Sequence, residues 1–126
     1  MRQMVYTSVA SSQMDQADVF NIVQTSVDNN MARGITGFLI YADNKFCQLI
    51  EGEEANLRGL LKTISADPRH KDIEILVDEP ISARRFPRWR MQRVSKSTGS
   101  VDEIRQTLSN ASGGRGTLRH VERFLA

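Results

Sequence analysis

The stretch Ile35–Glu51, ITGFLIYADNKFCQLIE, contains two apolar runs joined by the turn-forming residues Ala42-Asp43-Asn44. Short runs that are rich in aromatic and β-branched residues and broken by such a turn are typical of a β-hairpin. The sequence therefore predicts strands over Ile35–Tyr41 and Lys45–Glu51. This hairpin is the centre from which the flanking elements are placed.

A strand and a helix are predicted on the N-terminal side of the hairpin. Val5, Tyr6 and Thr7 favour a strand over Met4–Val9. Apolar residues then recur at helical spacing and predict an amphipathic helix over Asp15–Asn29. The apolar residues of that helix are Val19, Ile22, Val23 and Val27.

A second helix is predicted directly after the hairpin. Its apolar face is formed by Ala55, Leu57, Leu60, Leu61 and Ile64. The helix must end by Ala66, because Asp67 precedes Pro68 and the residue before a proline is disfavoured in the helical region.

Two more strands are predicted after the second helix. Ile73, Ile75 and Val77 alternate with acidic residues and predict a fourth strand with one apolar face. A loop over Pro80–Pro87 separates it from a fifth strand over Arg90–Ser95.

The order strand, helix, strand, strand, helix, strand predicts an α+β fold of the ferredoxin-like βαββαβ type with an additional strand. The two long helices must then share one face of the sheet. We assign residues 1–96 to this core and residues 97–126 to a C-terminal extension of the same domain, with two short helices. These helices either cover the other face of the sheet or contact a second chain.

Composition excludes several classes of function. The chain has 126 residues, a net charge of +2 and 25% charged residues, which is ordinary for one globular domain and gives little long-range attraction for nucleic acid. Cys47 is the single cysteine and the two histidines are far apart, so no metal motif can be assembled locally. No apolar run is long enough to span a membrane. We expect a cytoplasmic protein without a metal.

Gln48 is the most informative residue of the hairpin. It shares a strand face with Phe46 and Ile50, whereas Cys47 points to the other face and is expected to be a buried, inert thiol. Burying an amide without partners costs about 1–3 kcal/mol. Tyr6 lies on the first strand, which neighbours the third in this topology. Tyr6 and Gln48 can then be hydrogen-bonded neighbours under the helices, either as a structural pair or as part of a site.

Further polar residues lie at the ends of the two predicted helices, and they favour a binding site over a purely structural pair. The relevant motifs are Tyr6-Thr7-Ser8, Asn29-Asn30 leading into Gly34-Ile35-Thr36-Gly37, Phe46-Cys47-Gln48-Leu49-Ile50-Glu51-Gly52, Asp67-Pro68-Arg69-His70, and Arg84-Arg85-Phe86-Pro87-Arg88-Trp89-Arg90-Met91. Each motif is weak alone, but the set is specific in this order and spacing. The chain resembles a BLUF domain, a blue-light sensor that binds a flavin, of the short single-domain type.

The resemblance implies a flavin between the two helices, with FAD as the common cofactor and FMN or riboflavin as open alternatives. It implies that Tyr6 is the photochemical electron donor and that Gln48 is the switching amide beside flavin N5 and O4. Trp89 and Met91 match a pair on the last strand whose burial differs between proposed signalling states. The remaining implied cofactor contacts are Ile22, Asn29, Asn30, Ile64, Arg69 and His70.

One departure from the family bears on the cofactor. Thr63 occupies a position on the second helix that is often basic in relatives, and a threonine cannot pair with a phosphate. The resemblance therefore implies ring contacts more firmly than phosphate contacts.

Two other classes share this topology. A ferredoxin-like RNA-binding module needs exposed stacking aromatics on the central strands, and the third strand offers Phe46 beside Gln48 and Ile50. An acylphosphatase-like enzyme needs an anion-binding loop after the first strand, and Ala10–Gln13 contains neither glycine nor arginine. We therefore expect a photosensor and not an enzyme.

We expect the light signal to leave the protein through a binding surface, because the residues after the core are too few to form an effector domain. The predicted route leads from Gln48 through Trp89 and Met91 to the C-terminal helices. We expect a homo-oligomer that signals to a separate protein in trans. His120 and the basic residues Arg84, Arg85, Arg88, Arg90, Arg93 and Lys96 are expected at the surface, the latter as a solvated strand edge or a site for an acidic partner.

Overall fold

The computed structural model describes residues 1–11, 15–95, 100–111 and 113–125. In chain order the elements of these residues are β1 (Arg2–Ala10), α1 (Gln16–Ala32), β2 (Thr36–Ala42), β3 (Lys45–Gly52), α2 (Glu54–Ala66), β4 (His70–Pro80), β5 (Arg90–Val94), α3 (Ser100–Asn110) and α4 (Gly114–Leu125). The strands form one sheet in the order β4-β1-β3-β2-β5. Within the described ranges, no helix is both long enough and apolar enough to cross a membrane.

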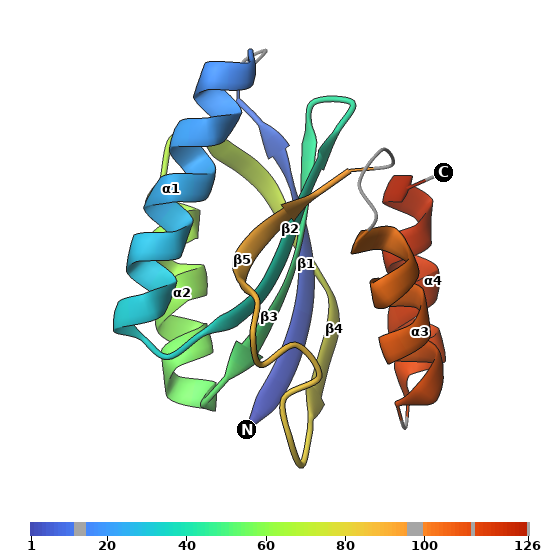
Figure 1. Cartoon of the computed structure of the whole chain (residues 1–126). Coiled ribbons are helices and arrows are strands. Elements are labelled where there is room, and N and C mark those ends of the chain that lie inside the picture. The colour runs from blue at the N-terminus through green and yellow to red at the C-terminus, as the bar shows by residue number, and fades with distance from the viewer. Residues whose placement is uncertain (12–14, 96–99, 112, 126) are drawn as a thin grey trace.

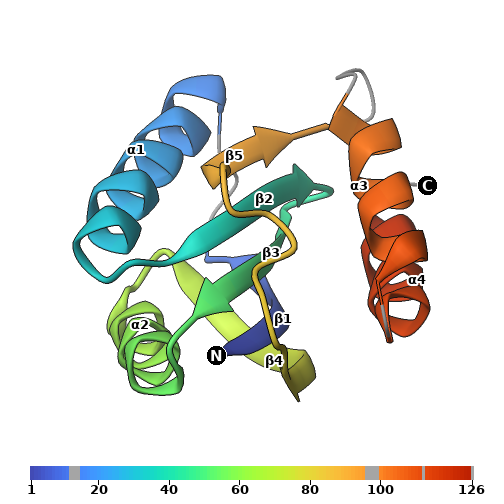
Figure 2. The same cartoon turned by 60° about the horizontal axis from the view of Figure 1, so that its bottom comes forward.

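The sheet separates two helical layers. Helices α1 and α2 lie on one face, and α3 and α4 lie on the other (Figures 1 and 2). The two central strands, β1 and β3, are antiparallel, and β5 is added at one edge, parallel to β2. The predicted ferredoxin-like order with an extra strand is confirmed, as is the shared face of the two long helices.

The β2–β3 hairpin has a tight turn at Asp43 and Asn44. Both residues are left-handed, with φ of 52° and 62°, as a two-residue type I′ turn requires. The Asn44 side chain accepts a hydrogen bond from Tyr41 Oη at 3.2 Å and donates to the carbonyl of Ala10 at 3.3 Å. The turn therefore fixes the register of β3 against both of its neighbours.

Both long helices have clear sequence-coded ends. Asp15 and Asp18 form a capping box at the start of α1, each side chain accepting from the other's backbone N–H. Helix α2 ends at Ala66 with Asp67 as its C-cap, as predicted. Helix α1, however, continues to Ala32 and not only to Asn29, so Asn29 and Asn30 lie inside its last turns.

The fourth strand is present, but the predicted alternation of its apolar residues was wrong. Strand β4 pairs with β1 through two register shifts, between Val5 and Tyr6 and between Thr7 and Val9. Such irregularities interrupt the period of two, so Ile75 is left 46% exposed while Leu76 and Val77 both pack toward the other face. The shifts occur beside Tyr6, at the centre of the sheet.

Two hydrophobic cores fill the two sides of the sheet. The core under α1 and α2, which we call the cleft-side core, includes Met4, Tyr6, Ile22, Phe46, Ile50 and Met91. The core under α3 and α4, the far-side core, includes Phe38, Cys47, Leu49, Phe86, Trp89 and Val94.

The C-terminal helices cover the far face of the sheet, which is the first of the two predicted alternatives. Val101, Ile104, Leu108 and Val121 are buried in the far-side core. Their burial against the sheet removes the reason to expect a second subunit over them. Lys96, Ser112 and the predicted boundary between residues 96 and 97 lie outside the described residues.

Candidate functional site

Tyr6 and Gln48 are direct partners across the two central strands. Tyr6 on β1 faces Gln48 on β3 in the antiparallel register, and the residues are 0% and 3% exposed. The predicted adjacency is confirmed, but the predicted hydrogen bond is wrong. Among the described residues, Tyr6 Oη has no hydrogen-bond partner, although it is buried. The pair is therefore not a closed structural staple.

Burial determines the protonation state of the Tyr6 phenol. Burial, with a smaller contribution from Cys47, raises the pKa of Tyr6 well above 10.0. The phenol stays neutral at physiological pH, and a bare phenolate here would be costly. Loss of an electron from Tyr6 must therefore be accompanied by transfer of its phenolic proton to an acceptor at the site.

A narrow cleft lies between α1 and α2 beside this pair. Its walls include all the predicted cofactor contacts except Tyr6: Ile22, Asn29, Asn30, Gln48, Ile64, Arg69 and His70. Ile22 and Ile64 also pack against the cleft-side core. The cleft volume is about 30 Å³, so a planar ring enters only if α1 and α2 move apart.

Asn30 offers the clearest indication of ligand-binding chemistry in this cleft. Its residue is 0% exposed, yet neither Oδ1 nor Nδ2 has a partner in the described part of the chain. Its backbone carbonyl is satisfied, because it accepts from the N–H groups of Arg33 and Ile35 at 3.1 and 2.9 Å. The buried amide therefore offers a donor and an acceptor to an outside group. The imide edge of a flavin presents the matching acceptor and donor.

At the other end of the cleft the polar side chains already have hydrogen-bond partners within the protein. Arg69 forms an ion pair with Asp67, with Nη2 and Oδ2 2.7 Å apart, and the hydrogen bonds from the Arg69 side chain hold the pKa of Asp67 below its usual value. His70 Nδ1 lies 2.9 Å from Ser8 Oγ, and its ring packs against Phe46. Burial is the largest influence on His70 and lowers its pKa below 6.5, so it is neutral at pH 7. Asn29 is exposed at the cleft wall.

Trp89 and Met91 lie on opposite sides of the sheet. Met91 is fully buried in the cleft-side core with a left-handed φ of 60°, a conformation that costs about 1–3 kcal/mol for a non-glycine residue. Trp89 packs in the far-side core, with ring centroids 5.9 Å from Phe38 and 5.1 Å from Phe86. The structure thus places Met91, and not Trp89, on the face of Gln48.

A buried carboxylate on the far side was missed by the sequence analysis. Glu51 is 0% exposed and accepts hydrogen bonds from the backbone N–H groups of Arg85 and Phe86, at 2.9 and 2.7 Å, and from Gln3 Nε2 at 3.1 Å. The Arg85 guanidinium donates to Gln3 Oε1 at 2.8 Å and to Glu79 Oε1 at 3.1 Å. Period-two alternation from Gln48 was enough to place Glu51 on the apolar far face.

The first two arginines of the basic run are not a solvated strand edge, which corrects that expectation. Arg85 belongs to the Glu51 network, and Arg84 Nη1 donates to the Glu51 carbonyl and to Thr36 Oγ1 at 2.8 and 2.9 Å. Arg88 and Arg90 are exposed, as predicted. The loop between β4 and β5 is therefore anchored to β3 by both the backbone and the side chain of Glu51.

Two other expectations concern single residues. Cys47 does face away from Gln48, and burial raises its pKa to about 12, so the predicted inert thiol is confirmed. His120 is only partly exposed, and its Nδ1 is buried, so it is not simply a surface residue. No group of His, Cys, Asp or Glu suited to a metal ion occurs in the described ranges.

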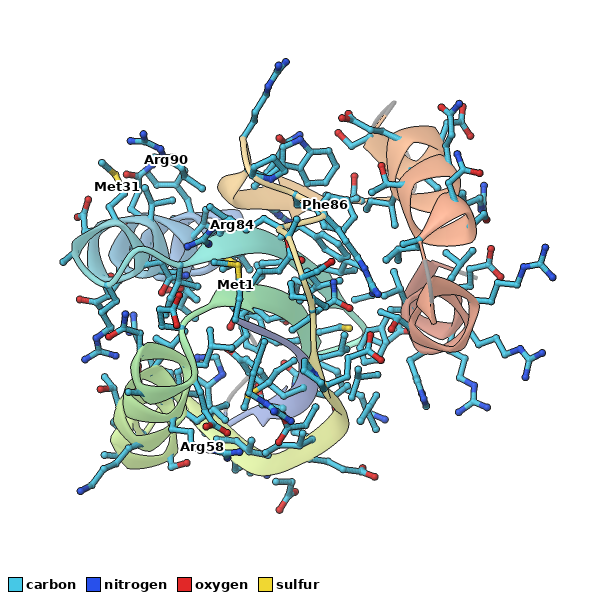
Figure 3. All side chains as sticks on the ribbon, turned by 90° about the horizontal axis from the view of Figure 1, so that it is seen from below. Met1, Met31, Arg58, Arg84, Phe86 and Arg90 are labelled. Carbon is cyan, nitrogen blue, oxygen red and sulfur yellow. The ribbon has the colours of Figure 1, made fainter. Side chains whose placement is uncertain are left out.

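A larger hollow, of about 290 Å³, lies at the end of α1 and is not the better site. Figure 3 shows Met31, Arg84 and Arg90 around it, with Phe86 on the side toward α3. The hollow is open to solvent, and the Arg84 guanidinium on its wall is already engaged with β2 and β3. The narrow cleft combines apolar walls with unpartnered buried donors and acceptors, which is the chemistry of a ligand site.

A family model described as "Sensors of blue-light using FAD" matches residues 1–92. The chain belongs to the BLUF family. BLUF domains bind flavin, so the predicted family and cofactor class are confirmed. Because Phe46 is fully buried, it cannot stack on RNA bases, and the RNA-binding alternative has no support.

Sequences similar to this BLUF domain occur in proteins of different kinds, and the chain spans only a small part of the curated relatives it matches. The chain is 32% identical over 95 residues to the photoactivated adenylate cyclase subunit alpha of Euglena gracilis, covering 73% of this chain and 9% of that protein. It is 25% identical over 122 residues to the blue light- and temperature-regulated antirepressor BluF of Escherichia coli K12, covering 97% and 30%. The dark-state structure of the BLUF protein BlrB is 35% identical, with a TM-score of 0.74, and the match covers 93% of this chain and 89% of BlrB.

Proposed function

We propose that Tyr6 and Gln48 perform the light reaction in this BLUF protein, with the flavin held between α1 and α2. The single observation that carries the proposal is the Tyr6–Gln48 register pair beside a cleft whose buried Tyr6 and Asn30 side-chain atoms lack protein partners. Asn30 would hold the pyrimidine edge of the ring, and Ile22 and Ile64 would enclose its faces. Bound flavin supplies blue-light absorption and an oxidising excited state.

The buried residues set the course of the reaction. Tyr6 gives up an electron together with its phenolic proton, since burial disfavours the ionised phenol, and both return when the cycle closes. While Tyr6 lacks its electron and proton, the Gln48 amide rotates or tautomerises. Either change exchanges the positions of its hydrogen-bond donor and acceptor. No net substrate is consumed in this cycle, and we propose that the chain is a sensor and not an enzyme.

The signal would leave the site through β3 and the far-side network. Glu51 lies on the same strand as Gln48 and binds the backbone N–H of Phe86, which packs against Trp89. Trp89 in turn belongs to the core under α3 and α4. A changed hydrogen bond is worth about 1 kcal/mol, so the output must be a marginally balanced element. We propose Met91, whose left-handed backbone is strained, as that element.

The receiver of the signal would be a separate protein that binds the outer surface of α3 and α4. Support comes from the position of these helices at the end of the Glu51–Phe86–Trp89 route. We keep residues 1–96 as the photosensor core, 97–126 as its output extension, and a cytoplasmic location. A homo-oligomer also stays a prediction. Sedimentation of the flavin-loaded protein in the dark and in the light checks it.

Flavin loading and illumination test the light reaction. The protein reconstituted with FAD should show a flavin spectrum and a reversible red shift under blue light. Gln48→Leu should keep the flavin and lose the red shift, because leucine has a similar size but no hydrogen-bonding atoms. Tyr6→Phe should abolish the normal photocycle.

Two matched variants serve as controls for this test. Gln24→Leu changes an exposed amide on α1, and Tyr41→Phe removes the phenolic hydroxyl that donates to Asn44 at the hairpin turn. Both should shift like the parent. A protein that takes up no FAD would refute the proposal, and a normal red shift in Gln48→Leu would show that another group is the switch.

A further inference from the structure

All but one of the buried side-chain polar atoms without partners, among the described residues, belong to residues at or beside the cleft between α1 and α2. They are Tyr6 Oη, Asn30 Oδ1 and Nδ2, and Arg33 Nη1, and the exception is His120 Nδ1. Tyr6 and Asn30 are already assigned to the flavin. Arg33 has the same physical signature, and its position was not predicted by the sequence analysis.

The Arg33 side chain reaches from the end of α1 to a residue of α2 that lines the cleft. Arg33 is the C-cap of α1, three residues after Asn30 and on the helix face that carries Asn29. Its Nη2 donates to Thr63 Oγ1 on α2 at 3.1 Å, and Thr63 lines the cleft. The guanidinium is therefore held at the cleft, on the helix turn next to Asn30.

The charge of Arg33 is also uncompensated, in contrast to that of Arg69. Arg69 is held by four hydrogen-bond contacts with Asp67, including both carboxylate oxygens. No carboxylate lies within ion-pair distance of Arg33 in the described part of the chain. A buried guanidinium N–H without an acceptor is costly, so a ligand oxygen at this point would be bound strongly.

We propose that Arg33 is a cofactor-binding residue whose Nη1 donates to a carbonyl oxygen of the flavin pyrimidinedione ring, beside the contacts of Asn30. The inference rests on the proposed flavin site. A guanidinium beside that ring withdraws electron density from it and favours added negative charge, which raises the reduction potential of the bound flavin.

Arg33→Met tests this role, with Arg119→Met on the exposed face of α4 as the matched control. Arg33→Met should weaken flavin binding in the dark by about tenfold or more, the factor expected for a hydrogen bond from a charged group. It should also lower the midpoint potential of the bound flavin, while the light-induced red shift remains. Arg33→Lys keeps the charge and should recover part of both losses.

Two arms of the experiment separate the possible outcomes. Equilibrium dialysis with riboflavin, which has no phosphate, should show the same factor as with FAD; a loss confined to FAD would place Arg33 at the phosphates and overturn the ring assignment. Unchanged affinity and potential in Arg33→Met, with normal flavin binding by the parent, would overturn the inference and leave the flavin site intact. If Arg33→Met fails to fold, Arg33→Lys and Arg33→Gln provide the same two readouts.

Discussion

Buried polar groups are hydrogen-bonded within the protein on the far face of the sheet around β3, but several on its cleft face are not. On the far face, every oxygen of the Glu51 carboxylate accepts a hydrogen bond, and Arg85 and Gln3 complete the network. On the cleft face, Tyr6 Oη and the Asn30 amide are equally buried and have no partner among the described residues. Buried groups that satisfy one another hold the fold together, whereas buried groups that do not are suited to a ligand.

The largest expected effect concerns the satisfied face. Glu51→Ala removes the acceptor of two backbone N–H groups and one side-chain amide, all of them buried or half-buried. Breaking a buried charged network typically costs about 3–5 kcal/mol. We expect the free energy of unfolding, measured in urea on the apoprotein, to fall by about 3 kcal/mol.

Glu74→Ala is the matched control for this variant. Glu74 is exposed on β4, so its loss should change the free energy of unfolding by less than about 0.5 kcal/mol. Equal stability of the Glu51 and Glu74 variants would mean that the network contributes nothing to the fold.

Tyr6→Phe should produce a smaller effect with the opposite sign. Removing a buried hydroxyl that has no partner relieves a desolvation cost, so the apoprotein should gain about 1 kcal/mol of stability. Tyr41→Phe loses the hydrogen bond to Asn44 and should lose about 0.5–1 kcal/mol. Urea unfolding of the two apoproteins measures both changes. A clear loss of stability in Tyr6→Phe would show that the phenol has a partner in the protein.

The smallest expected effect is a pH dependence from His70. Burial lowers its folded-state pKa below the unfolded value of 6.5, so the unfolded chain binds more protons as the pH falls through that range. The stability contribution of neutral His70 is therefore present above pH 6.5 and decreases as the pH falls below it. Asp67, whose pKa is also lowered, acts in a separate window below pH 4.

Urea midpoints between pH 5 and pH 8 check this dependence. His70→Gln should remove its share of the slope below pH 6.5. An unchanged slope in that variant would assign the pH dependence to other groups.

The sequence was informative where the chain is periodic. Alternation placed Gln48 and Cys47 on opposite faces, and the element order placed Tyr6 beside Gln48. The register shifts of β4 left no trace in its alternating pattern, so the exposure of Ile75 was not foreseen.

The rest depends on contacts between distant segments. The loop over residues 81–89 has no periodicity. The sequence therefore could not predict that Glu51 binds the backbone of this loop, or that Trp89 and Met91 lie on opposite sides of the sheet. The contact of Arg33 with Thr63 depends in the same way on the packing of α1 against α2. One signal was available: an acid at Glu51, on the apolar face of a buried strand, demanded partners.

Asn30→Leu tests most directly the claim that the unpartnered groups of the cleft are held for flavin, with the exposed Asn21→Leu on α1 as the control for helix propensity. Two quantities are measured together, the free energy of unfolding of the apoprotein and the dissociation constant for FAD. The account predicts an Asn30→Leu apoprotein at least as stable as the parent, with FAD bound about tenfold more weakly or worse. An apoprotein that is destabilised relative to Asn21→Leu, with unchanged FAD affinity, would contradict it.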